Sequence, residues 1–262
     1  MSFFSKVLSK VGIGAAKIET ELDNEQVTPG QQISGMITIT GGNVEQQINK
    51  IELDVYCNYF VEEQHQEDDE TLTRVIEKHC RINNLDIEDS FAIAPNHSKQ
   101  IPFSLELSPH TPLSLGKSSC WIQTNLDIDC ALDKADKDFL DVIPSPLQEA
   151  TLNALVDLGF NMTDAENEAC SSSERSLPFI QEFEFKARSG DFRGKLDELE
   201  LVMFINDDTL DIYLQIDRRA QGIGGLFAEA FDLDESNVHL SVSADDIDQI
   251  ADKLYAIIDA HC

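Results

Sequence analysis

Apolar and polar side chains alternate over residues 48–61, and this stretch predicts the central strand of the chain. The positions of one parity are apolar, namely Ile51, Leu53, Val55, Cys57, Tyr59 and Val61. The positions between them are mostly polar, namely Glu52, Asp54, Tyr56 and Asn58. A period of two places the two sets on opposite faces of a strand. We therefore predict one buried face, one wet face, and a second sheet that covers the buried face.

The same alternation, bounded by turn residues, predicts further strands on both sides of this one. In the first half the expected strands are 16–22, 33–40, 71–82, 90–94, 100–107 and 121–132. In the second half they are 179–187, 196–205, 209–217 and 238–242. Pro102 limits pairing and places its strand at a sheet edge or a strand start. Short strands divided by turns in this way are typical of β-sandwiches.

Helical periodicity predicts three helices. Residues 2–11 carry one apolar stripe. Ser145-Pro146 with Gln148 has the sequence of a capping box, so a second helix begins there and ends at Gly159. Ser243 begins a third helix, whose stripe is Ile247, Ile250, Ala251, Leu254, Ile257 and Ile258.

Composition divides the chain in two. Residues 133–146 are polar and acidic and end in prolines, so we interpret them as a linker. The predicted fold is mainly β, with a first sandwich over residues 1–132 that includes the leading helix. A second sandwich follows over residues 147–242, with a C-terminal helix over residues 243–262.

The charge is extreme, with 49 acidic against 19 basic side chains and a formal net charge of −30. Such a field repels phosphate backbones, so we exclude nucleic acid as a partner. The six cysteines include no Cys-x-x-Cys pair, which favours reduced, packed thiols. No apolar run approaches the ~20 residues of a membrane span, and lysines interrupt the N-terminal apolar residues. We therefore expect a cytoplasmic protein.

Three segments are candidate partner-binding sites. The first is the basic stripe of the N-terminal helix, with Phe3, Phe4, Lys6, Val7 and Lys10. Three interpretations of it stay open: it docks on its own chain, binds a partner protein, or lies at a membrane surface with weak affinity.

The second segment is 62–70, where six of nine residues are acidic, including Glu62, Glu63, Glu67, Asp68 and Asp69. A solvated hairpin tip is the plain interpretation. A docking loop for a basic partner and a loose divalent-ion site are the alternatives. The third segment, Arg218-Arg219, either pairs with local carboxylates or binds an acidic partner.

Nothing in the sequence indicates catalysis. It has no Gly-x-Ser-x-Gly elbow, no His-Glu-x-x-His motif and no cysteine–histidine metal spacing. We predict no catalytic residue, no cofactor and no metal site.

Several stretches taken together resemble the sporulation-control protein M family (SpoOM-like). They are SFFSKVLSKVGIGAAKIET, PGQQISGMITITGG, IPFSLELSPHTP, SSCWIQTNLDIDCALDKADKD, LPFIQEFEFKARSGDFRGKLDELELVM and DRRAQGIGG. The resemblance implies two tandem arrestin-like β-sandwich domains behind a short helix. It also implies a cytoplasmic regulatory or scaffold protein that contacts other proteins. It brings no catalytic or cofactor residues with it.

The sequence therefore predicts a non-catalytic interaction protein. An extended peptide added to an edge strand and a helix laid in a groove are two modes of contact that suit it. The first alternative is a peripheral membrane-associated regulator that uses Phe3, Phe4, Lys6, Lys10 and Lys17. The second is an enzyme or ligand carrier with an inter-domain site. The partner, the pathway and the oligomeric state are not predicted.

Overall fold

The computed structural model describes residues 15–67, 70–87, 90–129, 134–170, 176–217 and 237–262. The chain divides into two compact units. The first unit runs to residue 57 and also contains residues 81–111 and 120–142. The second unit contains residues 58–80, 112–119 and 143–262. The two longest described strands therefore belong to both units.

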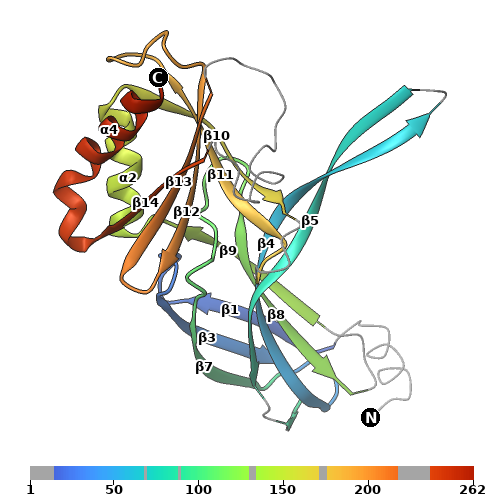
Figure 1. Cartoon of the computed structure of the whole chain (residues 1–262). Helices are drawn as coiled ribbons and strands as arrows, with labels where there is room; N and C mark the ends of the chain where they lie inside the picture. The colour runs from blue at the N-terminus through green and yellow to red at the C-terminus, as the bar shows by residue number, and fades with distance from the viewer. Residues whose placement is uncertain (1–14, 68–69, 88–89, 130–133, 171–175, 218–236) are drawn as a thin grey trace. The chain divides into compact units, whose positions relative to one another are not determined.

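The first unit is built from two sheets (Figure 1). One sheet has the antiparallel order β1-β3-β7, from Lys17–Leu22, Gln32–Thr40 and Ser98–Glu106. The other joins β4, β8, β9 and β2, from Gln46–Glu67, Cys120–Ile128, Lys134–Val142 and Gln26–Val27. Strands β5 (Glu70–Ile87) and β6 (Phe91–Ile93) also pair with β4.

The alternation predicted for the central strand is confirmed on its apolar side. Leu53, Val55 and Cys57 of β4 are completely buried, and so are Ile37 and Ile39 of β3 in the other sheet. Burial of the inner faces of two stacked sheets is the main source of stability in a sandwich. The wet face was predicted wrongly at two positions, because Asp54 is only 2% exposed and Asn58 only 4%.

The sheet topology bears on two predictions from the sequence, the position of Pro102 and the linker over residues 133–146. Pro102 lies in β7 opposite Met36, and β7 is the last strand of its sheet, as an edge proline requires. Residues 134–142, expected to belong to a linker, instead form β9 and pair with β8. The alternation that makes this strand places Leu140 and Val142 inside. Charged side chains on the other positions hid it.

The second unit has a five-stranded antiparallel run in the order β14-β13-β12-β11-β10. In chain order its elements are α2 (Pro146–Asp157), β10 (Phe160–Ala169), β11 (Phe179–Ala187), β12 (Glu198–Asn206), β13 (Thr209–Asp217), β14 (Asn237–Ser243), the 3₁₀ helix η1 (Ala244–Gln249) and α4 (Ile250–His261). β10 also pairs in parallel with β4, where Glu168 lies opposite Phe60.

The two described helices of this unit lie against one face of its sheet (Figure 1). The predicted capping box is confirmed: the backbone N–H of Ser145 donates to Gln148 Oε1 at 3.0 Å, and the Ser145 side chain accepts from the Gln148 backbone. Leu155 of α2 and Leu254 and Ile258 of α4 are completely buried. The apolar face of the sheet and the helices therefore share one core.

Residues 160–169, which lie outside the strands and helices expected from the sequence, form β10. Asp164, Glu166 and Glu168 alternate there with Ala165 and Asn167, which are buried. The strand has one small, buried face and one acidic face. The following subsection concerns the acidic face.

Candidate interaction surface

The structure describes only part of the predicted partner-binding set. Glu62 and Glu63 lie on β4, where Glu62 is exposed and Glu63 is half-buried. The other predicted residues lie outside the described residues or have side chains that are not described, namely Phe3, Phe4, Lys6, Val7, Lys10, Glu67, Asp68, Asp69, Arg218 and Arg219.

The part of β4 and β5 that belongs to the second unit, residues 58–80, is here named the distal hairpin. Figure 1 shows β4 and β5 as two neighbouring, twisted arrows. Leu72 and Val75 of β5 are 47% and 62% exposed. Lys78 Nζ lies 3.2 Å from Glu63 Oε1 across the hairpin. The sequence showed the acidic tip but not that apolar side chains lie open beside it.

Next to the hairpin, carboxylates gather on the sheet face whose positions alternate with the apolar core positions. We name this set the carboxylate face, and its members are Glu166, Glu168, Glu182, Glu184 and Glu200. Glu166 of β10 lies directly opposite Glu182 of β11, and Glu184 of β11 lies directly opposite Glu200 of β12. Like charges in cross-strand positions repel each other and destabilise a sheet.

Burial makes this repulsion stronger. Glu182 is only 3% exposed, and its Oε2 has no hydrogen-bond partner within the described part of the chain. Burial, followed by the charges of Glu168 and Glu200, raises the pKa of Glu182 to about 9. Burial, followed by Glu166, raises the pKa of Glu168 to about 7. Burial and neighbouring carboxylates therefore favour the protonated form of Glu182 at neutral pH, and the raised pKa of Glu168 makes it hold its proton to a higher pH than an ordinary glutamate.

Two described lysines pair with carboxylates on or beside this face. Lys117 Nζ lies 2.6 Å from Asp164 Oδ2 and 2.8 Å from Glu166 Oε2. Lys186 Nζ lies 3.3 Å from Glu198 Oε1. Both lysines are 40–50% exposed, so each pair stabilises the fold only weakly.

The carboxylate face also has an apolar part and adjoins the hairpin. Ile180 and Val202 are buried on the same face, with Cys170, Phe204 and Tyr213 packed against them. The charge of Glu62, on the hairpin, contributes to the raised pKa of Glu168. Within the second unit the two features form one acidic surface with apolar neighbours.

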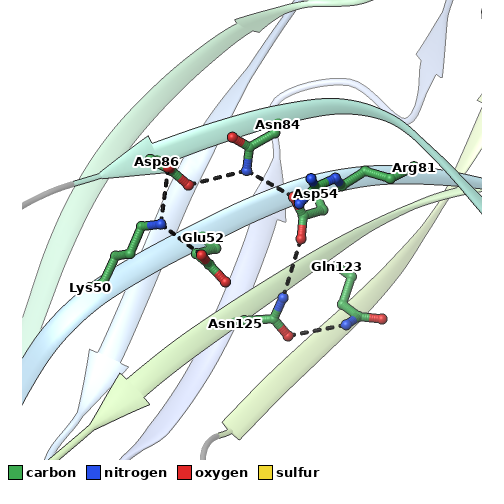
Figure 2. Close-up of polar contacts among 8 residues, drawn as sticks. All are labelled: Lys50, Glu52, Asp54, Arg81, Asn84, Asp86, Gln123 and Asn125. Carbon is green, nitrogen blue, oxygen red and sulfur yellow. Dashed lines mark hydrogen bonds and ion pairs between the residues drawn. The ribbon is translucent and has the colours of Figure 1, made fainter.

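The buried carboxylate of the first unit, Asp54, has a structural role instead (Figure 2). Asn84 Nδ2 of β5 donates to Asp54 Oδ1 at 2.9 Å, and Arg81 Nη1 lies 3.4 Å from the same oxygen. On the other side Asn125 Nδ2 of β8 lies 3.5 Å from Oδ2. Asp54 is buried because these side chains cover it, so it cross-links three strands.

A second ion-pair group lies beside Asp54 in Figure 2. Lys50 Nζ lies 2.7 Å from Glu52 Oε1 and 3.0 Å from Asp86 Oδ2. Hydrogen bonds to both carboxylates raise the pKa of Lys50. This group ties β5 to β4 at a more exposed position.

Two searches of the described residues bear on other kinds of site. No group of three or more His, Cys, Asp or Glu side chains is arranged there to hold a metal ion. No described helix is long and apolar enough to cross a membrane.

Residues 4–220 match the family model described as SpoOM protein. The chain belongs to the SpoOM family. It is 34% identical to the sporulation-control protein Spo0M of Bacillus subtilis over 267 residues, which cover 100% of this chain and 99% of the relative. The crystal structure of Spo0M from B. subtilis matches with a TM-score of 0.84 and 34% identity, over 95% of this chain and 100% of that one.

These comparisons confirm the resemblance inferred from the sequence. The mainly β fold of the SpoOM chain is confirmed as well, both by its strands and by the match to the solved relative.

Proposed function

We propose that this SpoOM-family chain is a non-catalytic, cytoplasmic regulatory protein that acts by binding other proteins. Its likeness to a sporulation-control protein over the whole length of both chains supports a regulatory role. The sporulation pathway itself is not part of the proposal.

The observation that carries the proposal is the exposed distal hairpin. Leu72 and Val75 lie open on β5, and within the described residues β5 pairs with no strand other than β4. An open strand edge can accept an extended peptide through backbone hydrogen bonds, and exposed apolar side chains beside it give that contact affinity. A partner segment added to β5 is therefore the mode of binding that the hairpin favours.

The test is a comparison of partner recovery by three forms of the full chain. The variant L72S/V75S removes the exposed apolar side chains of the hairpin. The control V156S changes a valine of α2 that is 57% exposed, so it matches the loss of exposed apolar surface elsewhere. We expect a set of proteins recovered from native cells by the wild type and V156S but not by L72S/V75S. Equal recovery by all three forms would contradict the proposal.

The N-terminal segment, predicted to be a helix, is tested separately, because it lies outside the described residues. Deletion of residues 1–12 is expected to weaken partner recovery and leave the thermal unfolding midpoint unchanged. The membrane-associated alternative predicts instead that the full chain sediments with anionic lipid vesicles at low salt and that the deletion abolishes this binding.

A further inference from the structure

We infer that the carboxylate face is the docking site for a basic segment of a partner protein. This inference rests on the proposed function, because it names the chemistry of the partner that the regulatory protein binds.

The first argument is the crowding of carboxyl groups on one face of the sheet. Glu166 faces Glu182, and Glu184 faces Glu200, across neighbouring strands. A sheet that needed only solubility would place such side chains where water screens them. Here the carboxyl groups stand side by side on a partly buried face, where Lys117 pairs with Glu166 and the charge of Lys186 acts on Glu184.

The second argument concerns the hydrogen bonding of one buried side chain, Glu182, and does not depend on how many acidic residues the face contains. Glu182 is only 3% exposed, and its Oε2 has no hydrogen-bond partner among the described residues. A buried carboxyl oxygen without a partner destabilises the fold. A guanidinium or ammonium group from a partner would supply both the missing hydrogen bond and the charge.

The mixed character of the face favours a basic side chain over a metal ion. The described residues include no three-ligand metal arrangement. Ile180 and Val202 lie on the same face as Glu182. The aliphatic stem of an arginine or lysine packs on such apolar surface while its charged end reaches a carboxylate.

Docking of a cation is linked to protons. Glu182 is flanked by the charges of Glu166 and Glu168 of β10, Glu184 of its own strand and Glu200 of β12. Glu62 of β4 acts on Glu168, Lys117 pairs with Asp164 and Glu166, and the charges of Lys186 and Glu198 act on Glu184. A positive charge placed among these carboxyls lowers their pKa values, so protons held by Glu182 and Glu168 leave when the basic segment binds.

One competing occupant belongs to this chain. Arg218 and Arg219 directly follow β13 in the sequence and lie outside the described residues. If these two arginines occupied the face, they would neutralise its carboxylates and leave no docking site for a partner. The experiment therefore includes a variant that removes both arginines.

The test is titration calorimetry of the full chain with a capped Arg-Val-Arg-Val-Arg peptide at pH 7.5. Each titration is run in two buffers of different ionisation enthalpy, which gives the number of protons released. We expect release of about one proton by the wild type. We expect at least fivefold weaker binding and no release for E168Q/E182Q. The control D207N/D208N removes two carboxylates from the β12–β13 turn, where asparagine tolerates the positive φ of Asp207, and keeps both properties. If the double variant does not fold, E168Q alone replaces it.

Three outcomes overturn the inference. They are binding without proton release, equal weakening in E168Q/E182Q and D207N/D208N, and a tenfold gain in peptide affinity in R218A/R219A. The first two show non-specific attraction to an acidic protein, and the third shows that the chain's own arginines occupy the face. If any of these occurs while L72S/V75S still loses partners that V156S retains, the docking site is wrong and the proposed function stands.

Discussion

Asn84 donates a 2.9 Å hydrogen bond to the carboxylate of Asp54, and this contact joins the two longest described strands, β4 and β5. Asp54 is 2% exposed, so the bond lies away from water. The part of β5 in the first unit is thereby fixed on β4, while the distal hairpin belongs to the second unit and has Leu72 and Val75 exposed.

Asp54→Ala is expected to lower the free energy of unfolding by about 2–3 kcal/mol, because three donors then lose a charged acceptor. Urea denaturation followed by circular dichroism measures this change. The matched control is Glu52→Gln, two residues along the same strand, where the side chain is 41% exposed. Its loss should stay below about 1 kcal/mol. Equal losses at the two positions would show that burial of Asp54 has no special role.

Glu182→Gln is expected to make the thermal midpoint less sensitive to pH. Glu182 has a raised pKa of about 9, so the folded state holds a proton that the unfolded state releases above about pH 4.5. That contribution to stability is complete below the unfolded pKa and is lost as pH rises toward 9. Glutamine stays neutral throughout. The thermal midpoint of the variant should match that of the wild type near pH 5 and exceed it increasingly up to pH 9. Each kcal/mol of added stability raises the midpoint by about 2–4 °C in a protein of this size.

The control for this prediction is Asp207→Asn in the β12–β13 turn, where the carboxylate is exposed. Its midpoint should follow the wild type over the whole pH range. A Glu182→Gln curve parallel to that of the wild type would contradict the protonated, buried state of Glu182.

Gly116→Ala is expected to destabilise the second unit by about 3 kcal/mol. Gly116 has a φ of +57°, and a Cβ there would lie 2.3 Å from the carbonyl oxygen of Ala165 in β10. The control is Gly194→Ala, where φ is +78° but no atom lies within 4 Å of the added Cβ. That variant should be destabilised only by the strain of an alanine at positive φ, about 1 kcal/mol. Chemical denaturation separates the two, and equal losses would show that the contact with Ala165 is unimportant.

Period-two burial was readable from the sequence wherever one face of a strand is strongly apolar. It predicted β4, and it placed β11 and β13 at their observed bounds. It failed for β9 and β10, because the inward positions of these strands are occupied in part by small or polar residues such as Ala165 and Asn167. The alternation was present in the acids instead of in the apolar residues.

The candidate surface was only partly predictable for a related reason. Asp164, Glu166 and Glu168 repeat every second residue, as do Glu182 and Glu184, and Glu198 and Glu200. This signal predicts three strands that each have one acidic face. It does not reveal that the register of β10, β11 and β12 places the acidic residues opposite one another. The burial of Asp54 was equally hidden, since Asn84 and Asn125 are 30 and 71 residues away in sequence.

Hydrogen–deuterium exchange of the full chain, alone and with a recovered partner, tests most directly whether the distal hairpin is the binding surface. The account predicts that binding slows amide exchange in peptides from residues 58–80 and leaves peptides from α4 unchanged. Slowed exchange confined to α4 and the other helix, with residues 58–80 unaffected, would contradict it.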